Sequence, residues 1–316
     1  MSNQRRVIFI DNTYPFLFQR LTELGFSCEA HYSTPREEIL DQLSDCFGLV
    51  LRSRLRIDTE MLNQGKKLAF VARSGVGLEH IDLETAAQLG IQVLSSPEGS
   101  RDTVAEHGIG MLLMLMNNLG LADRQIREGN WVRAANRGIE IKGKTIGIIG
   151  YGNMGSAFAQ KISGFGARLI AYDKFKTNYG NDLVQEVELE QIWNEADIVT
   201  LHIPFLPENH YFVDDAFLQR FKKPIYLVNT ARGTVLNTAH LVKNLQSGKV
   251  LGAALDVFEY EEQSFENLKP EDLPEPFQYL RRANNVVLTP HLAGSSLEAN
   301  EGHARVLAQK IEKLFC

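Results

Sequence analysis

The chain has 316 residues, of which 44% are hydrophobic and 23% are charged. This length is enough for two domains that each bury a core, and the composition is ordinary for a globular protein. The formal net charge of −6 gives no electrostatic case for binding nucleic acid or an anionic membrane surface.

The cysteines and the hydropathy of the sequence indicate the cellular compartment of the protein. Cys28, Cys46 and Cys316 lie far apart and form no Cys-x-x-Cys pair, which indicates free thiols and neither a disulfide framework nor a metal site. The first residues lack the apolar core of a signal peptide, and the most apolar window, residues 109–116, is too short to span a bilayer. We therefore expect a cytoplasmic protein without a bound metal.

The first hundred residues alternate between strand-like and helix-like segments. Apolar runs predict buried strands at residues 7–10, 48–51, 68–72 and 91–94, and helical segments are expected at 16–24, 36–43, 59–63 and 83–89. This alternation favours a parallel sheet covered by helices on both faces. The turn-like stretch 97–100 marks the predicted crossing into a second domain.

A long helical segment is expected from Arg101 to about Glu128. Its middle, residues 109–116, is apolar nearly all round, so this helix must be buried. Ordinary core packing is one interpretation, and burial against a partner subunit is the other.

Residues 144–173 read as the start of a dinucleotide-binding βαβ unit. An apolar strand, 145–149, runs into Gly150-Tyr-Gly152-Asn153-Met154-Gly155, a helical segment at 156–162 and a second strand at 167–172 that ends at Asp173. Gly150 permits the tight turn, Gly152 lets the backbone approach a pyrophosphate, and Gly155 lets helix and strand pack closely. The helix start offers free N–H groups and about half a positive charge to phosphates.

Asp173 predicts the choice of cofactor. Its carboxylate is placed to accept the hydroxyls of an adenosine ribose and would repel a 2′-phosphate, so it favours NAD over NADP. Lys174 and Lys176 soften this preference without reversing it. A glycine motif alone is weak evidence, but strand, motif, helix, strand and acid in register are much more specific.

The rest of the chain continues the alternation. Helices are expected at 189–196 and 238–246, and strands at 197–202, 224–230, 251–257 and 286–288, with a polar excursion reaching about residue 283. Ser295 and Glu298 match a capping box. The final helix is expected to place Leu297, Ala304, Leu307, Ile311 and Leu314 on one side.

Polar groups gather where the predicted strands end. They are Ser74-Gly75-Val76-Gly77, His202, Thr230-Ala231-Arg232-Gly233, Asp256 and Thr289-Pro290-His291. Ligands bind beyond the carboxyl ends of strands in open α/β sheets, so these groups together predict a site.

Three ordered motifs follow the glycine motif: Asn229-Thr-Ala-Arg-Gly233, Asp256-Val-Phe-Glu-Tyr-Glu261 and Thr289-Pro-His-Leu-Ala-Gly294. In that order they resemble the D-isomer-specific 2-hydroxyacid dehydrogenases, over nearly the whole chain, and most of all the short D-3-phosphoglycerate dehydrogenases. The resemblance implies an α/β fold of two doubly wound parallel-sheet domains. A Rossmann-type NAD domain, 100–291, would be inserted into a flavodoxin-like substrate domain of residues 1–99 and 292–316.

The resemblance also implies a catalytic set of Arg232, Glu261 and His291. A histidine has a suitable pKa to act as base in oxidation and as acid in reduction, although a lone His after a strand is more often a polar loop residue. Glu261 would pair with the imidazole. Arg232 would hold the substrate carboxylate with its planar fork, where a surface salt bridge is the alternative.

The implied binding residues fall into two groups. Ser74, Gly75 and Val76 form the substrate loop, in which the backbone N–H groups of Gly75 and Val76 would bind the other carboxylate oxygen. Asp256 would accept from the nicotinamide carboxamide, and His202 and Pro204 would line the cofactor pocket. The NAD-binding set is Gly150, Gly152, Asn153, Met154, Gly155, Asp173, His202, Pro204, Thr230, Ala231, Arg232, Asp256, His291 and Gly294.

Two positions depart from the family pattern. Proline usually follows the catalytic Glu, but Glu262 stands there and Glu259 is also near. The five-residue spacing from Asp256 selects Glu261 and leaves the other two open. His80 stands where the family often carries Asn, which could alter the substrate loop.

We expect NAD-dependent interconversion of a D-2-hydroxy acid and its 2-keto acid, with D-3-phosphoglycerate, in serine biosynthesis, as the leading substrate. Arg52 and the partner subunit's copy of Arg133, which follows a Gly-x-Trp sequence, would then contact the phosphate across a homodimer interface. The other interpretation is that Arg52, Arg54 and Arg56 form a solvated edge.

Other functions stay open. A glyoxylate, hydroxypyruvate or other D-2-hydroxyacid reductase would use the same residues, and an NAD(H)-sensing, co-repressor-like binding protein could retain them. A formate dehydrogenase is disfavoured, because that branch carries Gln where this chain has Pro290.

Overall fold

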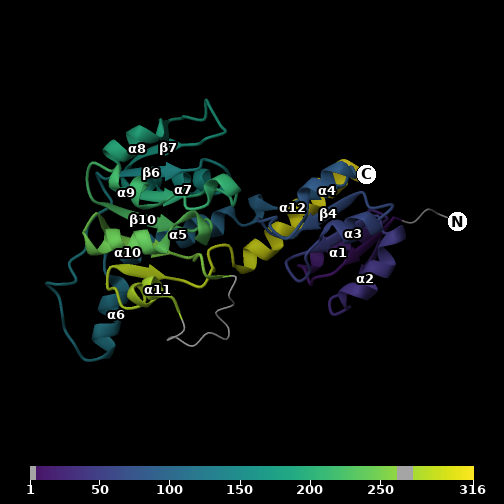
Figure 1. The fold of residues 1–316 in the computed structure, drawn as a ribbon, viewed down its shortest axis with the longest axis horizontal. Helices are drawn as coiled ribbons and strands as arrows, with labels where there is room; N and C mark the ends of the chain where they lie inside the picture. The colour runs from purple at the N-terminus through teal and green to yellow at the C-terminus, as the bar shows by residue number, and fades with distance from the viewer. Residues whose placement is uncertain (1–4, 262–272) are drawn as a thin grey trace. The chain divides into compact units, whose positions relative to one another are not determined.

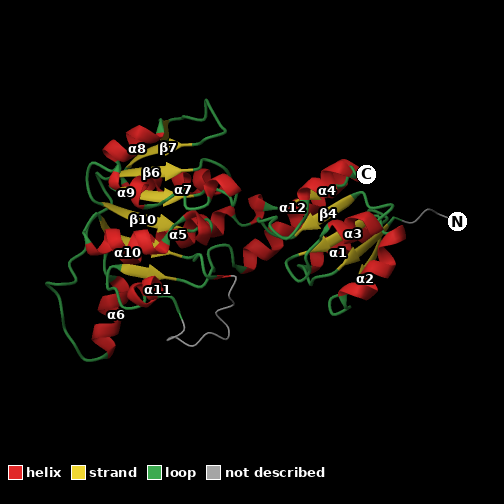
Figure 2. Ribbon diagram, viewed as in Figure 1, coloured by secondary structure: helices red, strands yellow, loops and turns green. Residues whose placement is uncertain are grey.

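The computed structural model describes residues 5–261 and 273–316. The chain divides into two compact units, the first made of residues 1–103 with 295–316 and the second of residues 104–294. Each unit is an α/β fold built on a parallel sheet with helices on both faces (Figures 1 and 2). The chain therefore has the two doubly wound sheets expected from its sequence, with the second inserted into the first.

The first unit contains a five-stranded sheet in the order β2-β1-β3-β4-β5, which is the flavodoxin-like order. Its strands are β1 (Arg6–Phe9), β2 (Ser27–Ala30), β3 (Gly48–Leu51), β4 (Phe70–Arg73) and β5 (Gln92–Leu94). All neighbours in this sheet are parallel. Their carboxyl ends thus lie along one edge, and the loops that follow β3 and β4 carry Arg52 and Ser74.

Helices cover both faces of this sheet. One face packs against α2 (Arg36–Gln42), α3 (Thr59–Gln64) and α4 (Leu83–Gln88). The other packs against α1 (Pro15–Glu23) and the C-terminal helix α12 (Leu297–Phe315). Because α12 buries Ala304, Leu307 and Ile311 in this core, the end of the chain completes the domain that its beginning starts.

The second unit contains a seven-stranded parallel sheet in the order β12-β11-β10-β9-β6-β7-β8. The strands are β6 (Thr145–Ile149), β7 (Arg168–Tyr172), β8 (Val184–Glu186), β9 (Ile198–Leu201), β10 (Ile225–Asn229), β11 (Val250–Leu255) and β12 (Val286–Leu288). The order reverses between β6 and β9, which makes this a Rossmann-type sheet with its switch point beside the glycine motif.

Two helical layers cover the second sheet. Helices α5 (Arg101–Met116) and α7 (Asn153–Ile162) pack against one face. Helices α8 (Leu189–Glu195), α9 (Asp215–Gln219), α10 (Thr238–Gln246) and α11 (Glu275–Leu280) pack against the other. The strands are therefore buried on both sides, as their continuous apolar runs predict.

The predicted single helix from residue 101 to 128 is wrong. It is divided into α5 and α6 (Leu119–Arg127) by Asn118, whose φ of 51° lies in the left-handed region and cannot continue a right-handed helix. Residues such as Ile109, Leu112 and Leu115 are buried in the unit's own core, which supports ordinary core packing. Among the described residues, no helix has the length and apolarity needed to cross a membrane.

Several short elements were not expected from the sequence, namely β2, β8, α9 and α11. They span only three to six residues, too few for a period to stand out. The strand β2 is at best half-buried and lies at the sheet edge. Edge strands of this kind lack the apolar run that marks a central strand.

The start and face of α12 also differ from expectation. Ser296, and not Ser295, is the N-cap, since its Oγ accepts from the N–H of Ala299 at 3.0 Å. Leu297 and Leu314 are exposed at 84% and 51%, so they do not belong to the buried face. The helix buries Ala299, His303, Ala304, Leu307, Ala308 and Ile311 instead.

Candidate active site

Of the three glycines in the turn after β6, only Gly152 has open space beside its backbone. Gly150 has a φ of +92°, and a Cβ there would lie 2.6 Å from the carbonyl oxygen of His202. A Cβ on Gly155 would collide with the carbonyl oxygen of Gly150. A Cβ on Gly152 would meet nothing within 4 Å, so the backbone is open to an approaching group at Gly152, as a pyrophosphate site requires.

Helix α7 begins at Asn153, three residues before the predicted helix start. Asn153, Met154 and Gly155 thus form its first turn, where backbone N–H groups have no intrahelical acceptor. These donors and the positive end of the helix dipole stand beside the open face of Gly152. The residues present therefore fit a bound pyrophosphate.

Asp173 follows β7 and is held against the glycine turn. Its Oδ2 accepts from the N–H of Tyr151 at 2.7 Å, and its Oδ1 accepts from the N–H groups of Phe175 and Lys176 at 2.9 and 3.0 Å. Lys174 is paired with Glu208 at 2.9 Å. The carboxylate is therefore fixed at the tip of the second strand, where a ribose would lie.

Two buried polar atoms at the carboxyl ends of β9 and β10 have no partner among the described residues. They are Nδ1 of His202 and Oγ1 of Thr230. The other ring nitrogen of His202 lies 3.0 Å from Oγ1 of Thr200, and burial lowers the pKa of His202 to about 3, so the ring is neutral. Unpaired buried polar atoms are costly, and a cofactor at this edge could supply their partners. Pro204 is exposed two residues beyond His202.

The loop after β10 carries Arg232 in a defined turn. Buried Asn229 accepts from the N–H of Ala231 at 3.0 Å and donates to the carbonyl oxygen of Arg232 at 3.1 Å. A Cβ on Gly233 would collide with the backbone of Phe258, so glycine allows this loop to pack against the chain after β11. The turn is thus specified by Asn229 and Gly233 on either side of the arginine.

His291 and Glu261 form a close pair. Nδ1 of His291 lies 2.7 Å from Oε2 of Glu261. The hydrogen bond with Glu261 raises the pKa of His291, against burial, which lowers it. His291 has a φ of 53°, a left-handed conformation that is uncommon outside glycine and is often found at functional sites.

Glu261 is distinguished from its acidic neighbours by this contact. The carboxylate of Glu259 instead accepts from the N–H of Thr238 at 3.2 Å. Glu262 lies outside the described residues. Among the described carboxylates, Glu261 is therefore the partner of His291, whereas its catalytic role stays a proposal.

Asp256 holds the loop that bears His291. The carboxylate is fully buried and accepts from Oγ1 of Thr289 at 2.5 Å and from the N–H groups of Leu292 and Ala293, both at 2.8 Å. Burial opposes ionisation, but these hydrogen bonds and, above all, the one with His107 outweigh it and lower the pKa of Asp256. Its visible role is to shape the loop from 289 to Gly294, and its contact with a nicotinamide carboxamide stays a prediction.

His107 belongs to the candidate site but was not predicted from the sequence. It lies on α5, and its Nε2 is 3.1 Å from Oγ1 of Thr289 and 3.4 Å from Oδ1 of Asp256. Its position two residues before the apolar run 109–116 of the same helix was the available signal. His107 thus ties α5 to the loop that carries the catalytic candidate.

The substrate loop after β4, in the first unit, corrects one prediction. Ser74 and Gly75 are buried, and the N–H of Gly75 donates to Oγ of Ser96 at 3.0 Å. That N–H is therefore used within the chain and does not serve as a substrate donor in this structure. The N–H of Val76 has no acceptor among the described groups, so it is the donor that remains.

In the loop after β3, the side chains of Arg52 and Arg54 have different surroundings. Oδ2 of Asp11 accepts the backbone N–H groups of Arg52, Ser53 and Arg54 at 2.6 to 3.2 Å. The guanidinium of Arg54 donates to the carbonyl oxygens of Ile10, Thr34 and His31, so it is structural. The exposed side chain of Arg52 makes no such contact with the described residues.

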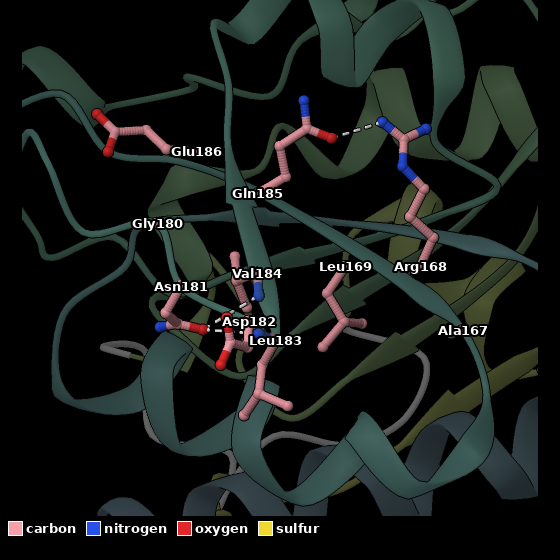
Figure 3. A pocket seen from close by; sticks show the side chains of 10 residues that line it. All are labelled: Ala167, Arg168, Leu169, Gly180, Asn181, Asp182, Leu183, Val184, Gln185 and Glu186. Carbon is pink, nitrogen blue, oxygen red and sulfur yellow. Dashed lines mark hydrogen bonds between the residues drawn. The ribbon is translucent and has the colours of Figure 1, made fainter.

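A hollow of about 580 Å³ lies elsewhere in the second unit, lined by residues 167–169 and 180–186 (Figure 3). Arg168 donates to Gln185 at 2.8 Å, and Asn181 accepts from the N–H groups of Leu183 and Val184. Arg168 and Leu169 are the first residues of β7, so this hollow is at the amino end of that strand. Ligands bind at the opposite ends of strands, and the hollow is not part of the candidate site.

The family is decided by residues 109–293, which match the model of the D-isomer specific 2-hydroxyacid dehydrogenase, NAD binding domain. The chain belongs to this family. Residues 109–293 lie within its second unit, residues 104–294, which is therefore the NAD-binding domain. The catalytic and substrate-binding assignments of individual residues stay proposals.

The chain is similar to D-3-phosphoglycerate dehydrogenase of Homo sapiens, with 34% identity over 303 residues, covering 94% of this chain and 54% of that protein. It is also similar to hydroxypyruvate reductase of Thermotoga maritima, with 35% identity over 281 residues, covering 89% and 87%. D-Lactate dehydrogenase of Aquifex aeolicus, solved with NAD and lactic acid, superposes with a TM-score of 0.79 at 26% identity, covering 97% and 94%. The chain spans about half the length of the phosphoglycerate dehydrogenases that it matches.

Proposed function

We propose that the protein is an NAD-dependent D-2-hydroxyacid dehydrogenase, which interconverts a D-2-hydroxy acid and its 2-keto acid. The 2.7 Å contact between Nδ1 of His291 and Glu261 carries this proposal. An imidazole held by a carboxylate at the ligand-binding edge of an NAD-binding domain is suited to moving a proton to or from a substrate oxygen.

The roles of the side chains follow from their contacts. Since a carboxylate accepts at Nδ1, that nitrogen carries a proton, and Nε2 is the nitrogen that faces the substrate. Nε2 would take the hydroxyl proton in oxidation and donate it to the carbonyl oxygen in reduction. Arg232 would bind the substrate carboxylate with its guanidinium fork. Bound NAD would supply the hydride acceptor or donor.

We further propose D-3-phosphoglycerate as the substrate, which would place the protein in serine biosynthesis in the cytoplasm. The similarity to phosphoglycerate dehydrogenases supports this choice. The guanidinium of Arg54 is bound to backbone carbonyl oxygens of the chain. The exposed side chain of the nearby Arg52 is therefore the cation that we propose for the phosphate. One arginine cannot hold both the carboxylate and the phosphate, so Arg232 needs such a companion.

A homodimer is part of this proposal. Arg133 is exposed in the segment after α6, together with Trp131, which is 80% exposed. Leu119, Ile126 and Val132, in α6 and the segment after it, are exposed as well. Several exposed apolar side chains in one stretch support an interaction surface, whereas a single one would not. In the proposed dimer, the copy of Arg133 from the partner subunit would approach the phosphate.

Hydroxypyruvate reduction is the second candidate function. The Thermotoga maritima relative supports it, because the similarity extends over 87% of that protein and 89% of this chain. The two substrates differ in charge, because phosphoglycerate carries a phosphate besides its carboxylate and hydroxypyruvate does not. The same residues Arg232, Glu261 and His291 would serve both reactions.

A steady-state panel tests the proposal. Purified protein would be assayed with NAD and D-3-phosphoglycerate, D-lactate or D-glycerate, and with NADH and hydroxypyruvate or glyoxylate. The highest kcat/KM with phosphoglycerate supports the first candidate, and the highest with hydroxypyruvate supports the second. Binding of NADH without turnover of any acid would contradict both and favour an NAD(H)-sensing protein.

A further inference from the structure

The substrate loop of the first unit is fixed at Gly75 by one serine. Oγ of Ser96 accepts from the N–H of Gly75 at 3.0 Å, and the N–H of Ser96 donates to the carbonyl oxygen of Gly75 at 2.9 Å. Ser96 is completely buried. Both backbone groups of Gly75 are thus held by a residue that follows β5, 21 positions along the chain.

Ser96 is held in turn by His303 of α12. Nδ1 of His303 lies 2.8 Å from the carbonyl oxygen of Ser96 and 2.9 Å from its Oγ. A carbonyl oxygen only accepts, so Nδ1 carries the proton and donates to Ser96. The Oγ hydrogen remains for the carbonyl oxygen of Gly75, at 3.3 Å. His303 is itself buried, with 8% of its surface exposed.

The helix that carries His303 is seated closely on the turn after Ser96. A Cβ on Gly99 would collide with the backbone of His303, and a Cβ on Gly302 would collide with the backbone of Gly99. This close approach fixes where His303 stands relative to Ser96. Gly75, Ser96 and His303 therefore form one buried array of hydrogen bonds from α12 to the substrate loop.

Gly75 needs such support. Its φ of +149° is a conformation that only glycine adopts readily, and glycine also has the largest freedom to leave it. The next N–H, that of Val76, has no acceptor among the described groups. The orientation of this free donor depends on the Gly75–Val76 peptide, and the array holds Gly75.

We propose that His303, acting through Ser96, is a positioning residue that orients the N–H of Val76 toward the carboxylate of the substrate. This inference rests on the proposed dehydrogenase function and adds a contribution from α12 to it. The energetic basis is preorganisation, because a donor already held in its binding geometry loses less entropy when the carboxylate arrives.

The test compares variants of His303 with a control on the same helix. His303→Leu removes the donor and keeps an apolar side chain of moderate size, whereas His303→Asn offers an amide N–H near the position of Nδ1. Lys310→Ala is the matched control. Lys310 also joins α12 to this region, through Ser95 and Glu98 at 2.8 to 3.0 Å, but these hydrogen bonds involve neither Ser96 nor Gly75.

We expect His303→Leu to raise KM for the hydroxy acid by roughly tenfold, the factor expected from one weakened hydrogen bond to a charged group. The Kd for NADH should stay unchanged, because the cofactor domain is not altered. His303→Asn should restore much of the lost KM, and Lys310→Ala should leave it at the wild-type value. Ser96→Ala should reproduce His303→Leu, which covers the case that His303→Leu fails to fold.

Amide hydrogen exchange gives a second readout that does not depend on turnover. Exchange at Gly75 should accelerate in His303→Leu and Ser96→Ala but not in Lys310→Ala. A folded His303→Leu protein with wild-type KM, or an equal KM increase in Lys310→Ala, would overturn the proposal. A wild-type protein that turns over no hydroxy acid would contradict the proposed function itself, and only the structural part of the array would then be supported by exchange.

Discussion

Oε2 of Glu261 lies 2.7 Å from Nδ1 of His291, so the carboxylate occupies one of the two ring nitrogens. In the proposed mechanism, Nε2 is therefore the nitrogen that exchanges a proton with the substrate. The same contact raises the pKa of His291, which keeps more of the imidazole protonated near neutral pH. A carbonyl substrate needs that protonated form, and a hydroxyl substrate needs the neutral form.

The first prediction concerns His291 as the acid and base. His291→Asn suits the left-handed backbone, which Asn tolerates, and it removes the titrating group. We expect turnover to fall by roughly two to four powers of ten, while the Kd for NADH stays close to wild type. Stopped-flow and fluorescence titration would measure these quantities. Wild-type turnover in this variant would remove His291 from the mechanism.

The second prediction concerns Glu261 and pH. Glu261→Gln removes the negative charge that favours imidazolium, so the pKa of His291 should fall. Keto-acid reduction needs protonated His291 and is lost as pH rises through this pKa, so the loss should begin at lower pH in the variant. Hydroxy-acid oxidation needs the neutral form, so its rise should also move to lower pH. Glu259→Gln is the matched control, because Glu259 bonds to Thr238, and a shift there instead would reassign the role.

The third prediction separates two glycines of the cofactor turn. Gly152→Ala places a methyl group where the chain has nothing within 4 Å, so Tm should stay near wild type while the Kd for NAD rises at least tenfold. Gly155→Ala forces a Cβ against the carbonyl oxygen of Gly150, so it should lower Tm as well. Calorimetry and NADH titration would measure both effects. Unchanged NAD affinity in Gly152→Ala would place the pyrophosphate elsewhere.

The fourth prediction concerns cofactor choice at Asp173. Asp173→Ala removes the carboxylate that, in our proposal, accepts from the ribose and repels a 2′-phosphate. We therefore expect kcat/KM with NAD to fall and the preference for NAD over NADP to become smaller. The variant also loses three backbone hydrogen bonds. Asp173→Asn is the control, since its amide oxygen can keep part of these bonds without the charge. A wild-type preference for NADP would contradict the assignment of Asp173.

The fifth prediction tests the phosphate site. Arg52→Ala should raise KM for phosphoglycerate far more than KM for an unphosphorylated 2-hydroxy acid, because only phosphoglycerate carries a phosphate that Arg52 can bind. Arg56→Ala is the control on the same loop. Arg133→Ala should act like Arg52→Ala if the dimer supplies it, and light scattering would show the oligomeric state. Equal effects on both substrates, or a fully active monomer, would contradict this part of the proposal.

The central strands and the glycine turn could be predicted because their signals are local. A buried parallel strand such as β6 is a continuous apolar run, and the turn after it needs glycine at fixed spacing. The break in the predicted helix 101–128 could not be predicted in this way. Asn118 adopts a left-handed conformation that Asn tolerates but does not require, while its neighbours on both sides are helical.

The candidate site shows the same division. Sequence by itself determined that Arg232, Asp256 and His291 follow strands whose carboxyl ends share one edge, because parallel strands impose that arrangement. Only the tertiary structure decided that Glu261 and not Glu259 pairs with the histidine, since both are acidic and two residues apart. Contact between them depends on how two loops from different strands fold back on each other.

Tertiary structure also decided which donors of the substrate loop remain free. The motif around Gly75 and Val76 offers two adjacent N–H groups, but nothing local says that Ser96 takes one of them. The link from Ser96 to His303 joins residues 207 positions apart and exists because α12 returns to the first sheet. Hydrophobic period and turn chemistry act over a few residues, whereas such hydrogen bonds form only after the chain has brought distant segments together.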